Sequence, residues 1–342
     1  MAISLSFMRD RLNSDPLAAI VALLRPRTVL SKFVSGAGSW AVQYPNYGHP
    51  SFALMLEGAC WLSVESAEPF LMEAGDYVLL PATPGFRMGS DLDALERPTL
   101  RVAEATPVGE VRHGIQEDEA AVRMLGGYFL FDPTNAPLLV GLLPTVVHIK
   151  ANDPGAERLT WIARAIGEES TTPRAGGDAI LTRLVEVMLI EAMRWRPAPV
   201  HDAAPLAGLL AGLADARMSK ALRLIHEDVS RRWTIEALGD AVGMSRAAFA
   251  ARFMQVLGVP PMEYVLRWRM ALAKDMLWHD GLSLGEVAHG IGYQSASAFS
   301  AAFSRSVGVS PSAFARADRT TASGDRPVPV EASLTTNNEM GA

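Results

Sequence analysis

A chain of 342 residues is longer than one hydrophobic core usually supports, so two or more domains are expected. Hydrophobic residues make up 49% of it and charged residues 20%, which excludes a disordered or fibrous chain, and the single cysteine excludes an internal disulfide framework. The net charge of −6 argues against a chain that is basic throughout, as many nucleic-acid-binding proteins are.

We expect no secretory signal at the N-terminal end. No stretch of the chain approaches the roughly 20 apolar residues of a membrane span, and the opening MAISLSFMRDRLNSD has too short an apolar run for a secretory signal. We therefore expect a cytoplasmic protein with no membrane partner, whose residues 1–14 form a flexible N-terminus.

Short strand-like runs alternate with turns rich in glycine and proline from about Leu17 to Phe131. Short strands at regular spacing are typical of a β-sandwich or barrel, and we predict such a domain over residues 15–150. The clearest strand candidates span residues 39–45, 51–58, 60–66, 76–82, 100–105 and 126–132.

Apolar residues change to helical spacing after Asp132. Residues 156–170 and 178–196 are predicted helices, and apolar side chains cover more of the second helix than a surface helix needs. Burial within the domain and a seam between two copies of the chain both explain this excess. Residues 151–212 are therefore predicted to form a helical dimerisation region and a linker, which three prolines between 197 and 205 mark.

An internal repeat is the strongest functional signal in the chain. Residues 234–245 match residues 283–294 at an offset of 49, and residues 249–261 match residues 299–311 at an offset of 50. Each copy contains a hydroxyl residue, an apolar stripe, a glycine, a second hydroxyl residue and two phenylalanines four positions apart.

One folding unit explains both copies. Thr234 and Ser283 are predicted to cap a first helix, and Ser283 with Glu286 has the spacing of a capping box. Gly243 and Gly292 are predicted to take a positive φ in the tight turn that follows. The second helix buries only its phenylalanine stripe and leaves its opposite side to solvent. This combination is the helix-turn-helix pattern.

The two copies are joined by residues 261–280, which are predicted to form one long amphipathic helix. Such a rod would place both second helices about one turn of DNA apart, ~34 Å. From Arg217 to Arg319 there are 13 Lys and Arg against 9 Asp and Glu, so this segment carries +4 and the rest of the chain −10. A helical bundle with no DNA role is the alternative, but two copies are fewer than the ~3 that a solenoid needs.

At these residues the chain resembles the AraC/XylS family of transcriptional regulators. The resemblance covers roughly residues 215–318 and is carried by IEALGDAVGMSRAAFA and LGEVAHGIGYQSASAFSAAFSRSVGVSPSAF. It implies a double helix-turn-helix domain over residues 213–318. Such a domain binds double-stranded promoter DNA to activate or repress transcription, in contact with RNA polymerase. Residues 319–342 lack aromatic side chains and hydrophobic periodicity and are expected to form a disordered tail.

The front half resembles the cupin-like sensor domain found on a subset of these regulators, through residues 15–27, 52–64, 71–82 and 125–149. The expected fold class is therefore multidomain α+β. A cupin-like β jelly roll is followed by helices and then by an all-α domain whose two helix-turn-helix subdomains are joined by a long helix. The resemblance implies a homodimer that responds to a small-molecule effector.

The resemblance places the DNA contacts on the second helix of each unit. The candidate residues are Ser245, Arg246, Ala247, Ala248 and Arg252 in the first unit and Gln294, Ser295, Ser297, Ser300 and Arg305 in the second. Ala301 and Ser304 stand where family members often carry arginine and lysine, so we expect weaker phosphate contact by the second unit. Base readout is expected chiefly from the first unit, with Arg246 donating to a guanine.

Six residues of the front half are candidates for lining a ligand pocket in the mouth of the jelly roll, or else for filling its core. They are Trp40, Tyr44, Phe52, Trp61, Phe86 and Arg87. Cys60 is expected to be a small buried hydrophobic residue rather than a redox sensor, because the chain has no second thiol to pair with it.

The metal-binding pattern of cupin enzymes is missing. Ala53 and Phe86 stand where such cupins place histidines, and the available donors are scattered along the sequence, at His49, Glu57, His113 and His148. We therefore expect no cofactor, no metal and no enzymatic activity. The alternatives are a constitutive regulator with a vestigial sensor and, from another class, a metal-dependent cupin enzyme.

Overall fold

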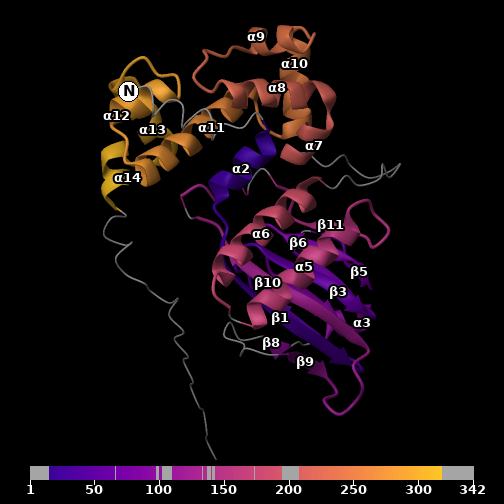
Figure 1. Ribbon diagram of the computed structural model, residues 1–342. Helices are drawn as coiled ribbons and strands as arrows, with labels where there is room; N and C mark the ends of the chain where they lie inside the picture. The colour runs from indigo at the N-terminus through magenta and orange to yellow at the C-terminus, as the bar shows by residue number, and fades with distance from the viewer. Residues whose placement is uncertain are drawn as a thin grey trace, which may run out of the picture.

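The computed structural model describes residues 15–65, 67–97, 100–101, 110–132, 134–136, 140, 143–172, 174–194 and 208–317 (Figure 1). The expected flexible N-terminus at 1–14, the proline-marked linker and the expected tail at 319–342 lie outside these residues. Within the described residues, no helix combines the length and the apolar character that a membrane crossing requires.

The strands form two stacked sheets. The six-stranded sheet has the order β11-β6-β3-β10-β1-β9 and the five-stranded sheet the order β5-β4-β7-β2-β8. The first consists of β1 (Arg27–Ala37), β3 (Ser51–Glu57), β6 (Tyr77–Leu80), β9 (Val111–Gly114), β10 (Val122–Leu130) and β11 (Val147–Ile149). The second consists of β2 (Ala41–Tyr44), β4 (Ala59–Val64), β5 (Phe70–Glu73), β7 (Phe86–Gly89) and β8 (Leu100–Arg101), and α3 (Leu92–Glu96) follows β7.

The space between the sheets is filled by a core rich in methionine and valine. Burial alternates along β4, so that Cys60, Leu62 and Val64 face this core. Met55, Met72 and Met124 approach it from other strands, and each is almost completely buried. Methionine adapts its shape to irregular gaps, which suits an interior that tapers between two twisted sheets.

A second core lies on the outer face of the six-stranded sheet. α5 (Ala156–Thr171) and α6 (Gly177–Arg194) cover that face (Figure 1). α5 turns Leu159, Ile162 and Ile166 inward at helical spacing, and all three are buried. This core extends without a break into the C-terminal helices.

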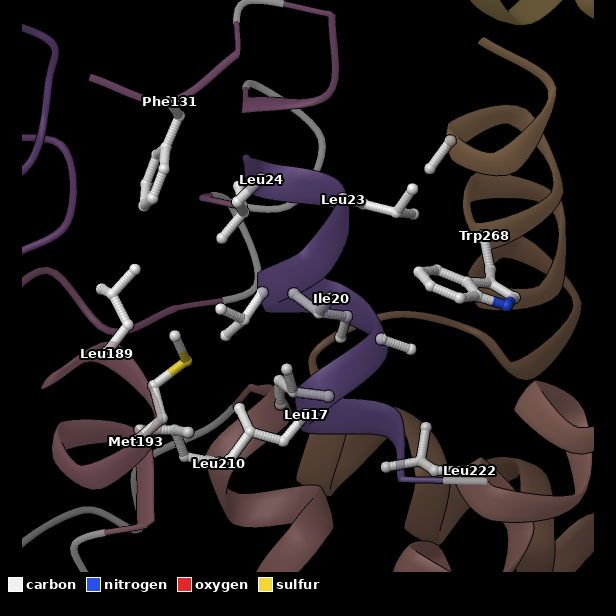
Figure 2. Close-up of a cluster of buried hydrophobic side chains, with 14 of the residues drawn as sticks. Leu17, Ile20, Leu23, Leu24, Phe131, Leu189, Met193, Leu210, Leu222 and Trp268 are labelled. Carbon is white, nitrogen blue, oxygen red and sulfur yellow. The ribbon is translucent and has the colours of Figure 1, made fainter. Parts of the chain in front are cut away.

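Helix α2 (Pro16–Leu24) joins the two halves of the molecule. Asp15 caps it by accepting a hydrogen bond from the amide of Leu17, and Pro16 occupies its first turn. Figure 2 shows α2 between Leu189 and Met193 of α6 on one side and Trp268 on the other. Its Ile20 and Leu24 are fully buried, and burial of such a side chain contributes roughly 1.5–3 kcal/mol. We expected strands from about Leu17 onward, and this expectation was wrong for the segment up to Leu24, which forms a helix.

From residue 208 to residue 317, the part of the C-terminal half that the structure describes, every regular element is a helix. This part contains α7 (Leu209–Ala214), α8 (Ala216–Glu227), α9 (Ile235–Ala241), α10 (Arg246–Leu257), α11 (Pro261–Asp275), the π-helical turn η1 (Met276–Asp280), α12 (Leu284–Gly290), α13 (Ala296–Val307) and α14 (Pro311–Ala317). The rod predicted over residues 261–280 is therefore an α-helix only as far as Asp275, and its last turn is wider. The fold class expected from the sequence is confirmed.

The local chemistry of both helix-turn-helix units follows the prediction. Thr234 accepts a hydrogen bond from the amide of Ala237 at 3.1 Å, and Ser283 with Glu286 forms a complete capping box. Gly243 and Gly292 have φ of 71° and 85°, the left-handed region that favours glycine. The four phenylalanines of the two stripes, Phe249, Phe253, Phe299 and Phe303, are fully buried.

Candidate DNA interface

The outer side of α10 is open to solvent, because the buried phenylalanine stripe occupies its inner side. All five residues predicted for the first unit are exposed, namely Ser245, Arg246, Ala247, Ala248 and Arg252. Ser245 also caps the helix by accepting a hydrogen bond from the Ala248 amide at 3.3 Å. Its hydroxyl therefore shapes the helix start while remaining at the surface.

Both arginines of this helix are paired with carboxylates. The Nη1 atom of Arg246 lies 3.4 Å from a carboxylate oxygen of Glu236, and both side chains are largely exposed. The Nε and Nη2 atoms of Arg252 donate to the same Asp215 oxygen at 3.1 and 2.8 Å. Any anion that binds these guanidinium groups has to compete with the two carboxylates. The exposed Arg246 pair is the weaker hold, because solvent screens it.

Of the two carboxylates, Asp215 makes more hydrogen bonds within the protein than Glu236. It is the N-cap of α8 and accepts hydrogen bonds from the amides of Arg217 and Met218, each at 3.0 Å. Partial burial raises the pKa of Asp215, but the Met218 amide, the Arg252 guanidinium and the Arg217 amide outweigh burial and hold this pKa below its usual value. Asp215 is therefore charged at neutral pH and orients Arg252.

The second unit presents a less basic surface. Gln294, Ser295, Ser297 and Arg305 are exposed on α13 and at its start, and Ser300 is half-buried. The Ser295 hydroxyl caps the helix through the Ala298 amide at 3.2 Å and lies 3.0 Å from the Ser297 hydroxyl. Arg305, in the last turn of α13, is the one cation that this helix offers.

Further residues share the exposed surface of the first unit. Met254 and Gln255 lie on the outer side of α10, and Gln255 accepts a hydrogen bond from Arg252 at 3.1 Å. Arg217 borders a shallow depression of about 400 Å³ with Met244 and Arg252. The sequence prediction stopped at Arg252. Extending the exposed stripe by one helical turn would have reached Gln255.

The six pocket candidates of the front half do not converge on one cavity. Trp40, Tyr44 and Phe86 pack in the core between the sheets, where the Tyr44 and Phe86 rings stack at 4.5 Å. Phe52 faces the opposite side of its sheet and belongs to the core beneath α5 and α6. Trp61 is half-buried and alternates with the inward-facing residues of β4.

Arg87, the sixth candidate, is engaged within the protein. Its Nη1 atom donates to the carbonyl oxygen of Leu95 at 2.7 Å, which ties β7 to α3. Among the possible metal donors, His148 lies 2.9 Å from Asp76, which also accepts hydrogen bonds from the amides of Glu73 and Ala151. No group of three or more metal-binding side chains gathers within the part of the chain that the structure describes.

A cleft that the sequence did not indicate lies between the two halves of the molecule. Its volume is about 560 Å³, and it is bordered by α2, α6, α11 and η1. Its apolar lining includes Ala22, Leu23, Trp268, Leu272 and Met276, and its polar lining includes Arg25, Arg183, Glu186, Asp275 and His279. No sequence pattern predicts this cleft, because its walls come from segments about 250 positions apart.

Polar contacts beside this cleft connect the two halves. We call these contacts the domain junction. The Nε atom of Arg25 donates to Asp275 at 3.0 Å, the side-chain Nδ2 atom of Asn135 donates to the carbonyl oxygen of Ala271 at 3.2 Å, and Lys274 donates to the carbonyl oxygen of Thr134 at 3.0 Å. The three α11 residues involved lie in its last turn and a half, so the β-rich half holds the rod just before η1.

Comparison with known proteins places these features in a family. Residues 15–196 match a family model described as Cupin, and residues 238–317 match one described as Helix-turn-helix domain. A putative AraC-like transcription regulator of Streptomyces antibioticus is 36% identical over 298 residues, which cover 87% of this chain and 97% of that protein. The corresponding protein of Streptomyces lividans is 35% identical over 298 residues, which cover 87% of this chain and 96% of its own length.

A more distant relative is the RCS-specific HTH-type transcriptional activator RclR of Escherichia coli, which is 25% identical over 306 residues that cover 87% of this chain and 95% of RclR. The Cupin match spans more than half of the chain, and the Streptomyces relatives match over nearly their whole length. With its duplicated helix-turn-helix units and its β-rich front half, the chain therefore belongs to the AraC-type family of DNA-binding transcription regulators with a cupin sensor domain.

Proposed function

We propose that this regulator reads its promoter with the outer sides of both α10 and α13. The observation that carries the proposal is that two copies of one capped unit each bury a phenylalanine stripe and expose the opposite side of their second helix. Arg246 supplies base readout from the start of α10, and Arg305 positions the second unit on phosphate. The proposed interface comprises the ten residues predicted from the sequence, extended by Gln255.

The experiment is selection of bound sequences from a random duplex library by the full-length chain, followed by footprinting of the selected DNA. Two protected half-sites, with a guanine requirement that is lost in Arg246→Ala, support the proposed interface. A single protected half-site, or a base preference that Arg246→Ala leaves intact, contradicts it. Lys220, an exposed residue of α8 outside the proposed interface, provides the matched control as Lys220→Ala.

The sensor is proposed to act through the domain junction. The cleft of about 560 Å³ has an apolar wall that includes Trp268 and Leu272 and a charged rim that includes Arg25 and Asp275. These features fit a small-molecule effector with an apolar body and a polar head. Binding there would alter the hold of α2 on α11 and so change promoter occupancy.

Binding of an effector in the cleft is tested with a variant whose own side chain fills the cleft. Ala22→Trp places a large side chain in the cleft, where it should abolish the effector response while leaving the selected duplex bound. Thermal-shift screening of a small-molecule library on the wild-type chain and on this variant supplies the measurement. A hit that stabilises both proteins equally assigns the effector to another place.

A constitutive regulator with a vestigial sensor is the second candidate. It is favoured by the filled space between the sheets, where Tyr44, Phe86 and the methionine cluster occupy the volume in which a cupin ligand would lie. Promoter occupancy in cells separates the two. A constitutive regulator occupies its site at the same level under all growth conditions, whereas a sensing one does not.

We further propose a cytoplasmic homodimer that activates transcription with RNA polymerase. Large apolar side chains are exposed on the two helices that cover the sheet, at 67% for Trp161, 47% for Ile180 and 46% for Val187. A two-fold contact between copies would cover such residues. The relative RclR is described as a transcriptional activator, which supports activation by this chain. Val187→Glu should yield monomers in analytical ultracentrifugation, and an unchanged dimer would exclude this seam.

A further inference from the structure

The second helix-turn-helix unit rests on the backbone of the first. A Cβ atom added at Gly292, in the turn of the second unit, would lie 2.2 Å from the carbonyl oxygen of Ser230 and 2.9 Å from its Cα atom. Ser230 lies in the loop between α8 and α9, four residues before Thr234, the N-cap of the first unit, and we count this loop with that unit. The two units therefore make direct backbone contact, and glycine is the residue that leaves room for it.

The equivalent glycine of the first unit has no such neighbour. Gly243 also has a positive φ, 71° against 85° for Gly292, but a Cβ atom added there meets nothing within 4 Å. Alanine at either position would strain the backbone to a similar degree. Only at Gly292 would it also push the two units apart, which makes the two glycines a matched pair.

Arg269 reinforces this contact from the rod. Its Nε and Nη2 atoms donate to the carbonyl oxygen of Val229 at 3.1 and 3.0 Å, and Nη2 also donates to that of Arg231 at 2.8 Å. These two residues flank Ser230. The same guanidinium lies 5.9 Å from the centre of the Tyr293 ring, next to Gly292. One side chain of α11 thus touches the contacting segment of each unit.

The contact continues into the proposed DNA-reading helix of the second unit. The Tyr293 ring meets that of Phe299 edge to face, with centroids 5.9 Å apart, and Phe299 is a fully buried residue of α13. Displacement of Tyr293 would therefore move α13 rather than only the turn. The physical link runs from the α8–α9 loop through Arg269 and Tyr293 to Phe299.

The connection between the rod and the second unit contains an irregular joint. α11 ends in the π-helical turn η1, and Gly281 follows in a left-handed conformation with a φ of 61°. The second unit also packs on the rod through α13, and a further contact on the first unit itself restricts its rotation about this joint. The packing of Gly292 and Arg269 against residues 229–231 is such a further contact.

We propose that Arg269 and Gly292 are positioning residues that set the distance and angle between α10 and α13, and thereby the spacing of the two half-sites on DNA. They act through the α8–α9 loop and Tyr293 rather than on the bases. The inference rests on the proposed use of both second helices in DNA binding.

The test is the half-site spacing selected from a random duplex library by the full-length chain. Wild-type protein and Gly243→Ala should each select two half-sites at one spacing. Gly292→Ala and Arg269→Met should select the same half-sites at shifted or multiple spacings. They should also bind the wild-type duplex about tenfold more weakly, because two sites held at a fixed separation act at a high effective concentration.

The outcomes separate this inference from the proposed interface. If the wild-type chain selects a single half-site, the proposed interface fails. If it selects two half-sites and both variants keep the wild-type spacing and affinity, the positioning role is overturned. Melting temperatures are measured alongside, and should Gly292→Ala fail to fold, Arg269→Met decides, because it retains most of the aliphatic stem and removes the guanidinium with its hydrogen bonds and its contact with the Tyr293 ring.

Discussion

The guanidinium of Arg25 lies 2.9 Å from the carboxylate of Asp275, across 250 positions of sequence and across the boundary between the β-rich and helical halves. Arg25 ends helix α2 in a left-handed conformation, with a φ of 43°, which is costly for a residue that has a Cβ atom. Strained backbone persists where its surroundings hold it in place. Here the ion pair and the packing of α2 hold the Arg25 backbone in this conformation. The pair is part of the domain junction.

Removal of Arg25 should weaken the whole molecule and not only the junction. Arg25→Ala leaves the Asp275 side chain, 9% exposed, without its guanidinium, and should lower the free energy of unfolding by about 1–3 kcal/mol in urea denaturation. Arg183→Ala, which removes a 77% exposed partner of Glu186, is the control and should change it by less than about 0.5 kcal/mol. Equal effects from the two variants would contradict a structural role for the junction pair.

The two arginines of α10 should differ in their contributions to DNA binding. Arg246→Ala should reduce affinity for the selected duplex by about 1–3 kcal/mol and relax the preference at one base pair, as expected for lost base contact. Arg252→Ala should weaken binding evenly across sequences and reduce the slope of log affinity against log salt concentration by about one, because Asp215 holds Arg252 and we assign this arginine a phosphate contact. Titrations at several salt concentrations measure both effects, and a base-specific loss in Arg252→Ala would reverse the assignment.

The buried imidazole of His226 should make the helical half sensitive to acid. Burial lowers the pKa of His226 from 6.5 to about 3, and its Nε2 atom lies 2.9 Å from the Tyr264 hydroxyl. Below pH 6.5 the unfolded chain takes up a proton that the folded chain refuses until about pH 3. Stability should therefore fall as pH drops through this window, by up to about 1.4 kcal/mol per pH unit.

The double variant His226→Phe with Tyr264→Phe removes this titration without leaving a buried hydroxyl unpaired. Urea midpoints between pH 4 and 8 should fall less steeply for it than for the wild-type chain. Parallel profiles for the two proteins would show that His226 has the same pKa in the folded and unfolded chain. The single variant Tyr264→Phe, which keeps the imidazole, should retain the wild-type slope.

Cys60 should be inert towards thiol reagents in the folded protein. Its side chain is fully buried between the sheets, and burial raises its pKa to about 12, so the reactive thiolate is scarce at neutral pH. Iodoacetamide should label it only in denaturant, and the wild-type chain and Cys60→Ala should show the same DNA affinity before and after peroxide treatment. Rapid labelling of native protein would point to an opening of the sheets and would revive a redox role.

The helix-turn-helix units could be predicted closely because their information is local. Caps such as Ser283 and left-handed turns such as that at Gly292 depend on residues within four positions of each other, and the repeat shows every signal twice. Helix α2 could not be predicted in the same way. All of its residues except Ala18 and Ala22 are buried, so it lacks the amphipathic pattern that identifies a helix.

The candidate sites show the same difference between features that depend on nearby residues and features that depend on distant contacts. Exposure of Arg246 and Arg252 followed from the phenylalanine stripe, whereas the pairing of Arg252 with Asp215 depends on a contact across 37 positions. In the β-rich half, strand β3 is buried on both sides, so alternation could not show which core Phe52 enters. The cleft depends on the packing of four separate elements and leaves no trace in any one of them.

The position of α2 also bears on how freely this architecture can be recombined. Its Leu17, Ile20 and Leu23 complete a hydrophobic core to which α6, α8 and α11 all contribute. Cutting the chain between residues 194 and 208 would strip this shared apolar surface from both fragments and expose it to water. A chimera that transplants the DNA-binding half onto a foreign sensor must therefore carry a helix that replaces α2, together with a cation placed opposite Asp275.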